Sequence, residues 1–442
     1  MGLTYPVQVG DQTAWISPPP TWTVTHIPER PSHPLADPID ALAGQLLRPV
    51  AGPALHELAR DASRVTIVVC DLTRPSPDDR ILPPILTILE SAGVHPERIQ
   101  ILIGTGLHRP VTPAEIASRF ACALERGVRI TSHNACDPEQ LVTLGDSRDG
   151  VPIQIHRAVA QADLVLTTGI VEPHQFAGFS GGWKTVVIGA GGECTINGCH
   201  TPRFLKLPGV GIGRVRGNPF QEFMEEAGRS AKVRFAVNTV LDGAGNILAI
   251  AAGTPDSVYE TLVSVAEEQF FCPVDRDYDV VISGAPSPKN SNLYQASRVP
   301  TYLQLGRGPL VRDGGTLIVG ARCPEGTGHG AGEERFAALL ESAQDPADLV
   351  RTAESEGLPG GGQRAYFMAR VLSKVKIVFV GASDPESIRR TGILTTPDFD
   401  SAWSHVTQPH DRPVEALIVE DPFRTLPMRV TAQPILDIAE EQ

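Results

Sequence analysis

The chain has 442 residues, 41% of them hydrophobic, and a formal net charge of −13. Its length exceeds what a single hydrophobic core ordinarily supports, which predicts two domains. The acidic excess disfavours nucleic acid and anionic membrane surfaces as partners, and no stretch approaches the ~20 consecutive apolar residues that a membrane-spanning helix needs.

Predicted strands and helices alternate along the first part of the chain. Residues 81–93 predict a helix whose two prolines lie near its first turn, and residues 112–127 predict another, with Thr112 and Glu115 as a capping box. This alternation predicts an α/β fold in which a parallel-type sheet carries helices on both faces. The strands are expected in the apolar runs RVTIVVCDLTRP (64–75), RIQILIGTG (98–106), VRITSHNACD (128–137) and ADLVLTTG (162–169).

Polar clusters follow three of these predicted strands. In parallel sheets the ligand crevice lies beyond the carboxyl ends of the strands, so the clusters are expected to converge at one edge. Any single cluster could be only a turn or a helix cap, and a lone histidine is more often an ordinary core or surface residue. Together the three clusters predict a ligand site built from Asp71, Thr73, Arg74, His108, Arg109, Glu172 and His174.

A second domain is expected to begin at residue 273, after an N-terminal cofactor-binding domain of residues 1–272. It is expected to end at residue 409, and the tail 410–442 is a candidate to pack back on the first domain. The predicted fold is thus two α/β domains with the active site in the interdomain cleft, where small ligands commonly bind. Strands of the second domain are predicted in DYDVVISGA (277–285), GGTLIVGA (314–321) and KVKIVFVGA (374–382).

The segment 168–204 carries the densest set of chemically active residues. A glycine-rich run, Gly178 to Gly182, leads into Lys184, and His174 and His200 flank it. Such a loop can bring backbone amides to an anionic ligand, while histidines can transfer protons or bind a metal. The lysine could equally be a simple phosphate clamp, although GGWK lacks the spacing of a P-loop.

Five motifs together resemble the nickel-dependent lactate racemase family. They are DLTRPSP, GTGLHRP, VEPHQFAGFSGGWKT, GCHTPRF and the LYQASR segment, in the family's order between residues 65 and 385. The resemblance implies two α/β domains with the active site between them. It also implies a nickel pincer nucleotide, a pyridinium-3-thioamide-5-thiocarboxylic acid mononucleotide that holds nickel through sulfur, carbon and sulfur.

The same resemblance implies a role for each motif residue. His108 and His174 would be the paired acid/base residues, and His200 would be the nickel ligand. Lys184 would anchor the cofactor covalently through a thioamide. The amides of the glycine loop would cradle the cofactor phosphate. The other cofactor-binding residues would be Asp71, Thr73, Arg74, Gly178, Ser180, Gly181 and Gly182.

Substrate binding would involve both domains. Arg298 stands where the family's pattern has a lysine, which keeps the charge but changes its reach, and Ile188 replaces a proline. The expected substrate is lactate or a related 2-hydroxy acid such as malate, whose second carboxylate would need a further cation. Candidates for that cation are Arg298, Lys289, Arg109 and Arg364. The residues implied to orient the substrate are Arg74, Tyr294, Gln295 and Arg298.

The implied reaction is racemisation or epimerisation at C2 of the 2-hydroxy acid. The hydrogen on that carbon is a very poor acid, so the implied route is proton-coupled hydride transfer to the nickel pincer nucleotide, via a 2-keto acid. Two histidines would serve the two enantiomers, each working in turn as base and acid, while an arginine holds the carboxylate. Because other proteins make the cofactor, maturation enzymes are implied partners.

Two other classes of function stay open. His108, His174 and His200 could bind a metal directly in a hydrolase or lyase, and Cys194 and Cys199 could supply a thiolate metal site. The glycine loop and its lysine could instead form a nucleotide-binding module without catalytic activity. The seven cysteines are odd in number and lack a CxxC pair, and no secretory signal is visible, which predicts reduced thiols in a cytoplasmic protein.

Overall fold

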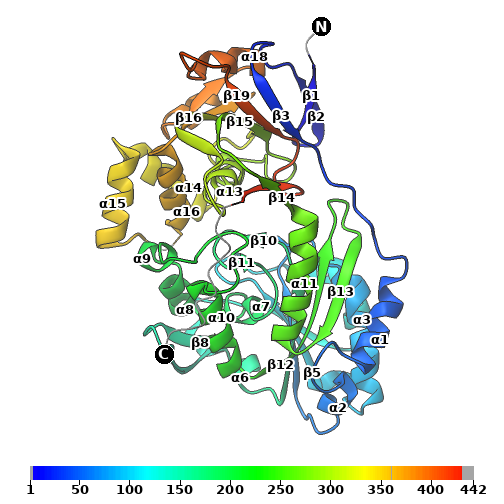
Figure 1. Ribbon diagram of the computed structural model, residues 1–442. Helices are drawn as coiled ribbons and strands as arrows, with labels where there is room; N and C mark the ends of the chain where they lie inside the picture. Colours follow the sequence, from blue (N-terminus) through cyan, green and yellow to red (C-terminus); the bar gives the residue numbers. More distant parts are fainter. Residues whose placement is uncertain (1–2, 360, 431–442) are drawn as a thin grey trace, which may run out of the picture. The chain divides into compact units, whose positions relative to one another are not determined.

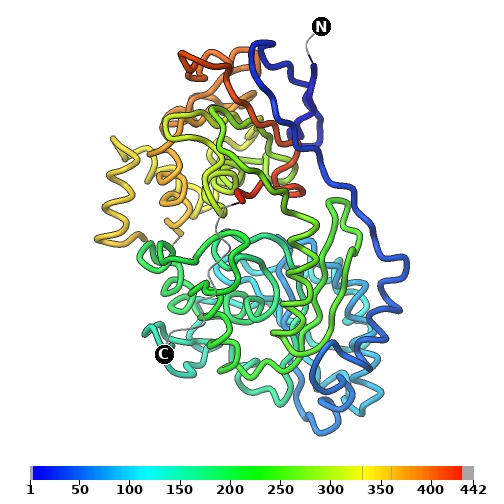
Figure 2. The backbone as a smooth tube through the Cα atoms, in the orientation of Figure 1, coloured from blue at the N-terminus to red at the C-terminus, as the bar shows by residue number. Residues whose placement is uncertain are grey.

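The computed structural model describes residues 3–359 and 361–430. The chain forms two compact units: a continuous unit, Pro31–Gln269, and a discontinuous unit made of Met1–Arg30 and Phe270–Gln442. Figure 2 follows the backbone from the discontinuous unit into the continuous one and back. This division differs from the sequence-based boundaries, because residues 1–30 and 410–430 group with 270–409. The rest of the tail, 431–442, lies outside the described residues.

The continuous unit is built on a six-stranded sheet with the order β13-β12-β9-β4-β5-β6 (Figure 1). Strand β13 runs antiparallel to β12, and the other neighbouring pairs are parallel. Apolar β-branched runs favour this arrangement, because parallel strands are covered on both faces. The strands are β4 (Val65–Cys70), β5 (Ile99–Gly104), β6 (Arg129–Ser132), β9 (Leu164–Ile170), β12 (Val233–Leu241) and β13 (Ile247–Gly253).

Helices and short hairpins surround this sheet. The expected α/β class is confirmed, and Thr112 and Glu115 form the expected capping box. Two-stranded pieces are β7 (Leu141–Asp146) with β8 (Pro152–His156), and β10 (Pro173–His174) with β11 (Gly178–Phe179). The helices are α1 (Pro38–Leu47), α2 (Leu55–Ala59), α3 (Asp78–Ser91), α4 (Pro113–Arg119), α5 (Ala121–Glu125), α6 (Arg157–Ala160), α7 (Lys184–Val187), α8 (Glu193–Cys199), α9 (Pro202–Leu205), α10 (Pro219–Ser230) and α11 (Pro255–Phe270).

Two helix boundaries differ from the sequence-based expectation. Helix α3 begins at Asp78, so Pro83 and Pro84 lie inside it and not in its first turn. An interior proline removes a helix hydrogen bond and costs about 3 kcal/mol, which the burial of one face of α3 offsets. The expected single helix over 112–127 is two short helices that meet at the fully buried Phe120.

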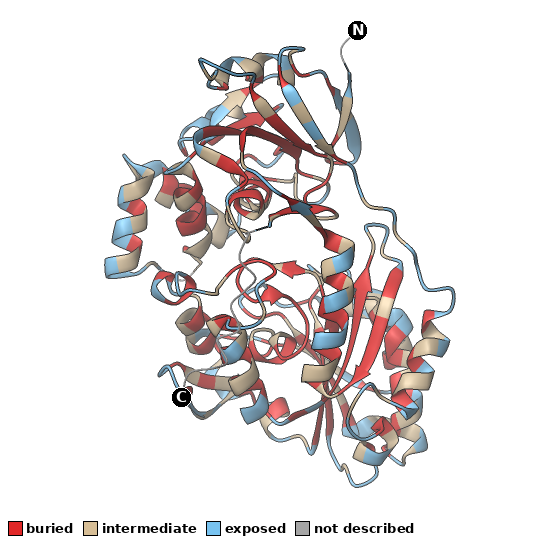
Figure 3. Cartoon of the chain, viewed as in Figure 1, coloured by how far each residue is buried: buried red, intermediate tan, exposed pale blue. Residues whose placement is uncertain are grey.

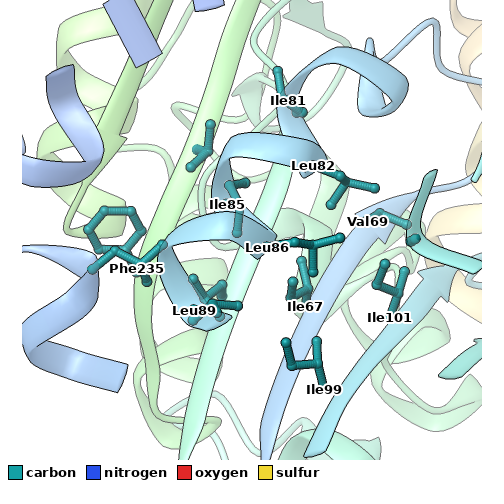
Figure 4. Packing of buried hydrophobic residues seen from close by; sticks show 14 of the residues in the cluster. Ile67, Val69, Ile81, Leu82, Ile85, Leu86, Leu89, Ile99, Ile101 and Phe235 are labelled. Atoms are coloured by element: carbon teal, nitrogen blue, oxygen red, sulfur yellow. The ribbon is translucent and has the colours of Figure 1, made fainter. Parts of the chain in front are cut away.

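The core of the continuous unit lies between the sheet and the helices α1, α2 and α3. Buried side chains of α3 point onto the strands β4 and β5 and reach Phe235 of β12 (Figure 4). Each fully buried aliphatic or aromatic side chain contributes about 1.5–3 kcal/mol through the hydrophobic effect. The labelled residues of this cluster are Ile67, Val69, Ile81, Leu82, Ile85, Leu86, Leu89, Ile99, Ile101 and Phe235.

The discontinuous unit contains a second six-stranded sheet, with the order β18-β17-β16-β15-β19-β3 and parallel pairing throughout. Its edge strand β3 comes from the N-terminal segment and pairs with β19 near the other end of the chain. The predicted strands at 277–285, 314–321 and 374–382 are confirmed as β15, β16 and β17. The strands are β3 (Thr23–Ile27), β15 (Tyr278–Gly284), β16 (Val311–Gly320), β17 (Lys376–Val380), β18 (Leu394–Thr396) and β19 (Glu415–Val419).

Further short elements complete the discontinuous unit. The central strands of both sheets are buried, whereas the edge strands β3, β6 and β18 carry exposed residues and the helices expose one face (Figure 3). Within the described residues, no helix combines the length and the apolar character needed to cross a membrane. The remaining elements are β1 (Tyr5–Val9) with β2 (Gln12–Ile16), β14 (Phe271–Val274) with β20 (Leu426–Arg429), and the helices α12 (Leu293–Ala296), α13 (Arg298–Gln304), α14 (Ala331–Ser342), α15 (Pro346–Glu356), α16 (Gln363–Leu372), α17 (Pro385–Arg389) and α18 (Phe399–Ala402).

Candidate active site

The loops after the adjacent strands β9, β4 and β5 meet in the continuous unit, as their parallel pairing dictates. Asp71, after β4, accepts a hydrogen bond from His108, after β5, with 2.6 Å between Oδ2 and Nδ1. Arg74 forms an ion pair with Glu172, after β9. The expected convergence of these residues is confirmed. Arg109 is an exception to this convergence, because its guanidinium forms an exposed ion pair with Glu115.

Asp71 fixes the orientation of His108. Burial alone would raise the pKa of this carboxyl, but hydrogen bonds from His108 and Thr73 and the charge of Arg74 bring the pKa below its ordinary value. Thr73 donates from Oγ1 to Asp71 Oδ1 at 2.7 Å. An ionised Asp71 requires a proton on His108 Nδ1, so the neutral ring presents the Nε2 lone pair. The His108 side chain is 63% exposed and can meet a ligand.

A guanidinium holds the loop that carries these residues. Arg119, the last residue of α4, forms an ion pair with the fully buried Asp78 at 2.7 Å. It also donates to the backbone carbonyls of Asp71, Arg74 and Ser76 at 3.3, 3.2 and 3.0 Å. We call Arg119 and Asp78 the loop clamp. Because one planar group satisfies three carbonyls at once, the clamp fixes the course of the 71–76 loop.

The glycine loop is held by side chains from distant parts of the continuous unit. Tyr259 donates its hydroxyl to the carbonyls of Ala177 and Phe179, at 3.2 Å each. Gly178 has a φ of +76°, and a Cβ there would lie 2.3 Å from a backbone oxygen of residue 214. The absence of a side chain at this position is therefore required by the close approach of two backbone segments.

The amides of the glycine loop donate largely within the protein. The amide of Gly182 donates to Asn238 Oδ1 at 2.8 Å, and the amide of Ser180 donates to the carbonyl of Glu172 at 2.9 Å. Ser180 also donates through its hydroxyl to the carbonyl of Ile170 at 2.8 Å. The predicted phosphate cradle therefore does not include these two amides in the present structure.

Lys184 opens helix α7 directly after this loop. Burial, reinforced by the positive charge of Arg74, lowers the pKa of its amine to about 8, while Cys70, Asp71 and Glu172 act in the opposite direction. These groups are the ones at the strand ends, so the lysine lies within their electrostatic reach. Among residues 3–359 and 361–430, its side-chain nitrogen has no hydrogen-bond or ion-pair partner.

His200 caps the carboxyl end of helix α8. Its Nδ1 lies 2.7 Å from the carbonyl of Ile196, so Nδ1 carries the proton and Nε2 keeps its lone pair. Burial lowers the pKa of the ring to about 4, and the charge of Lys184 adds to this effect. A neutral imidazole whose other nitrogen donates to a carbonyl is the form that ligates metals.

His174 lies across an aromatic cluster from His200. Its ring centroid is 5.5 Å from that of Phe176 and 6.5 Å from that of Phe220, while His200 lies 5.4 and 5.1 Å from the same two rings. Its Nδ1 accepts from the amides of Phe176 and Ala177 at 3.3 and 3.2 Å. A neutral His174 therefore carries its proton on Nε2, the opposite tautomer to His108.

Tyr294, Gln295 and Arg298 lie in the discontinuous unit. Tyr294 and Gln295 belong to helix α12, which Asn292 caps, and Arg298 opens α13. The positive charge of Arg364 lowers the pKa of Tyr294, against the effect of burial, and Arg298 contributes in the same direction. Their predicted role in orienting the substrate stays a prediction.

The chain offers little support for a metal held by protein side chains alone. Within the described ranges no group of three or more histidine, cysteine, aspartate or glutamate side chains is arranged to hold a metal ion. Cys199 is buried, burial raises the pKa of its thiol, and its Sγ lies 3.3 Å from the carbonyl of Ile196. In this arrangement the protonated thiol donates to a carbonyl and packs in the interior.

Several supporting residues carried no signal in the sequence. Arg119, Tyr259 and Asn238 belong to no motif and act on loops 43 to 82 residues away in the chain. Asn218, which is fully buried and donates to the carbonyl of Phe176 at 2.7 Å, is a fourth. In the sequence, an asparagine before Pro219 indicates only a helix N-cap. Asn218 does cap helix α10, in addition to its contact with Phe176.

Comparison with known proteins places the chain among enzymes of one kind. Residues 9–213 match the family described as "Lactate racemase N-terminal domain". The lactate racemase of Lactiplantibacillus plantarum is 30% identical over 380 residues, covering 84% of this chain and 87% of that protein. The lactate racemase of Thermoanaerobacterium thermosaccharolyticum is 28% identical over 345 residues, covering 77% and 79%.

Solved structures show the same fold. The apoprotein structure of the lactate racemase from Thermoanaerobacterium thermosaccharolyticum superimposes with a TM-score of 0.86 at 24% identity, covering 96% of this chain and all (100%) of that one. A crystal structure of a Thermotoga maritima protein gives a TM-score of 0.64 at 16% identity, covering 90% and 100%. At these identities the superpositions speak for the fold alone.

Proposed function

The chain belongs to the lactate racemase family, and from this premise we propose that it inverts C2 of lactate or of a related 2-hydroxy acid. The observation that carries the proposal is the pair of histidines with opposite tautomers, His108 and His174. One presents a lone pair on Nε2 and the other presents a proton on Nε2. A hydroxyl that must lose and regain its proton needs both forms.

The cofactor we propose is the nickel pincer nucleotide, and the residues present fit it. His200 offers an unprotonated Nε2 in a partly buried, neutral ring, which suits a metal ligand. Lys184 offers an amine that has no hydrogen-bond partner among the described residues and a pKa of about 8, which suits a covalent anchor. When bound, this cofactor would supply a centre that accepts a hydride and returns it.

The proton is handled by the two histidines. In one direction His108 takes the hydroxyl proton on Nε2, and the resulting imidazolium is stabilised by the Asp71 carboxylate at 2.6 Å. In the other direction His174 is the base, which requires the tautomer with its proton on Nδ1, so Nδ1 must give up the two long hydrogen bonds that it accepts from the amides of Phe176 and Ala177. Once a hydride has returned to C2 of the 2-keto acid, the oxygen on C2 regains a proton from either histidine.

The substrate carboxylate would be held by cations. Arg74 is proposed for the continuous unit, where a substrate carboxylate competes with Glu172 for its guanidinium. Tyr294, Gln295 and Arg298 are proposed for the discontinuous unit. An arginine fixes a carboxylate in direction as well as position, so it determines which atom faces the cofactor.

We further propose that the chain receives its cofactor from maturation enzymes in the cytoplasm. All seven cysteines are free thiols in the structure, which is compatible with a reducing compartment. An apoprotein made without those enzymes would lack activity although it folds normally.

The first experiment is to co-express the chain with cofactor-maturation enzymes and to measure nickel content, intact mass and the racemisation of 2-hydroxy acids. We expect about one nickel per chain and a mass adduct that maps to the peptide containing Lys184. Lys184→Ala should lose the adduct and the activity together. Lys206→Ala, a lysine outside the proposed site, is the matched control. Activity that survives in Lys184→Ala without nickel would refute the proposal.

A further inference from the structure

Two histidines that the proposed reaction does not use lie together inside the continuous unit. His133, directly after β6, is fully buried, and His156, the last residue of β8, is 7% exposed. Their ring centroids are 5.5 Å apart and the ring planes are inclined at 69°. We call these two residues the histidine pair. Two positive charges this close in the interior would repel each other, so the packing favours neutral rings.

Hydrogen bonds fix the tautomer of each ring. His133 donates from Nε2 to the carbonyl of Gly191 at 2.8 Å. His156 accepts at Nδ1 from the amide of Ala158 at 3.0 Å, and so caps helix α6. Its Nε2 therefore carries the proton and donates to Gln140 Oε1 at 3.2 Å. Each neutral ring thus has its N–H on Nε2 and an unprotonated Nδ1.

A second proton on either ring would have to bind Nδ1. In His156 that atom already accepts from the amide of Ala158, so protonation would break the cap of α6. In His133 it is shielded from solvent and has no hydrogen-bond acceptor among residues 3–359 and 361–430. A buried N–H without an acceptor loses its hydration and gains nothing in return. Protonation therefore opposes the folded structure at both positions.

The electrostatic surroundings of the histidine pair act in the same direction. Burial lowers the pKa of His133 and brings the pKa of His156 to about 4. The charges of three neighbours reinforce the effect on His156, whereas Asp137 opposes it. The three neighbours are His133, Arg129 and Arg157. The other titratable side chains on the adjoining segments are Cys136, Glu139, Asp146, Glu193 and Cys194.

The histidine pair holds the segment that carries both residues proposed to bind the cofactor. Gly191, which accepts from His133, lies between Lys184 and His200 in the chain. The backbone amide of His156 donates to the carbonyl of the preceding residue, Ala190, at 2.8 Å. Helix α8 begins two residues after Gly191, and His200 caps its other end. A shift at residues 190–191 would therefore change the spacing between the amine of Lys184 and the imidazole of His200.

We propose that the histidine pair is an acid-sensitive support for the segment 184–200, which positions Lys184 and His200 while both rings are neutral and releases them when a ring is protonated. This inference rests on the proposed function and deepens it, because His133 and His156 act as positioning residues through the two side chains proposed to hold the cofactor. The released segment binds the proton more readily than the held one. The support therefore weakens as the pH falls below about 6.5, the ordinary pKa of histidine.

Hydrogen exchange of the full-length apoprotein tests the support without cofactor or activity. Between pH 7.5 and pH 5, peptides covering residues 186–199 should lose protection by roughly 10-fold relative to peptides from β12, after correction for the intrinsic exchange rate. His133→Gln keeps an N–H for the Gly191 carbonyl, and His156→Asn keeps an acceptor for the Ala158 amide, but neither new side chain can be protonated. The double variant should lose less than about 3-fold. His95→Asn, at an exposed histidine, is the matched control and should behave as wild type.

A second measurement uses the nickel-loaded protein. After dialysis at pH 5, the double variant should retain at least about 3-fold more nickel than wild type, because protonation of His200 affects both proteins equally. If the double variant does not fold, each single variant should lose less protection than wild type. Equal losses of protection in wild type and variants, or no loss in wild type, would overturn the inference and leave the proposed function intact. If the exchange results hold but the loaded chain has neither nickel nor racemase activity, the proposed function fails and the acid-sensitive support stands.

Discussion

Burial sets the protonation state of the two residues proposed to hold the cofactor. The pKa of Lys184 falls to about 8 and that of His200 to about 4, in both cases chiefly because burial disfavours the charged form. At neutral pH each group is therefore deprotonated in a larger fraction of molecules than an exposed lysine or histidine would be. A covalent anchor and a metal ligand both need the lone pair that deprotonation exposes.

Lys184→Met is expected to stabilise the apoprotein at pH 7. The amine has a pKa of about 8 when folded and about 10.4 when unfolded, so the folded state carries a penalty that is fully present below pH ~8 and vanishes above pH ~10.4. The side chain is only partly hidden from solvent, so we expect a gain of about 2 kcal/mol at pH 7.

Urea denaturation of both proteins at pH 7 and at pH 9.5 measures this gain. The difference in the free energy of unfolding should shrink as the pH rises. Lys374→Met, at an exposed lysine paired with Asp313, serves as the control and should shift stability by less than about 0.5 kcal/mol. A gain that is the same at both pH values would show that the charge of Lys184 is not responsible.

At the scale of elements, the loop clamp joins helix α4 to the loop after β4. Arg119→Met would leave the fully buried Asp78 without its cation, while the hydroxyls of Ser76 and Thr168 still donate to it. We expect a loss of about 3 kcal/mol in the free energy of unfolding, as is usual when one partner of a buried ion pair is removed.

Chemical denaturation of Arg119→Met and of the double variant Arg119→Met/Asp78→Asn tests the clamp. The double variant should recover part of the loss, because a neutral amide costs less to bury than an unpaired carboxylate. Arg126→Met, which removes a half-exposed pair with Glu90, should cost no more than about 1 kcal/mol. Equal losses at positions 119 and 126 would contradict the clamp.

The regular elements follow the local pattern of the sequence where the cause is local. Apolar β-branched runs became β4, β5, β9 and β15, and the capping box at Thr112 formed as expected. Helix α3 runs through Pro83 and Pro84 because tertiary packing outweighs propensity, and no local pattern reports that packing. The placement of β3 beside β19 depends on pairing over a long sequence separation, which periodicity does not encode.

The same distinction between local and long-range causes applies to the residues of the candidate site. Residues that follow strands, such as Asp71, His108 and Glu172, could be predicted to lie close together because parallel strands bring their carboxyl ends together. The side chains that hold them, such as Tyr259, come from remote segments and have no motif of their own. The packing of the Arg364 guanidinium on the Tyr294 ring depends on the arrangement around α16, which the sequence alone does not reveal.

At the scale of the whole molecule, the described segments 3–30, 270–359 and 361–430 belong to the same unit. The chain leaves this unit after Arg30 and returns to it at Phe270. The amide of Arg30 donates to Thr425 Oγ1 at 2.9 Å, and Phe271 pairs with Leu426 between strands β14 and β20. Both points at which the chain passes between the units therefore lie beside residues 425–426. The continuous unit thus has its own sheet and core, whereas the discontinuous unit needs its N-terminal segment. Val7, Trp22 and strand β3 belong to its core and sheet.

We expect a fragment of residues 31–269 to unfold cooperatively when isolated. Residues 270–442 alone should not, because β19 becomes an unpaired edge and the apolar partners of Trp22 are exposed. Joining residues 1–30 to 270–442 through a short glycine-serine linker should restore cooperative unfolding, measured by thermal melts in circular dichroism. If 270–442 melts at the same temperature with and without 1–30, the N-terminal segment is dispensable.

The pairing of β3 with β19 also has a consequence for biosynthesis. Roughly 390 residues separate these strands, and a ribosome adding ~5–20 residues per second needs on the order of 20–80 seconds to make them. The nascent N-terminal segment therefore lacks its β19 partner while the continuous unit is synthesised and folds. Strand β19, one of the last strands to be made, pairs with β3, one of the first, so this sheet is completed only after most of the chain has been synthesised.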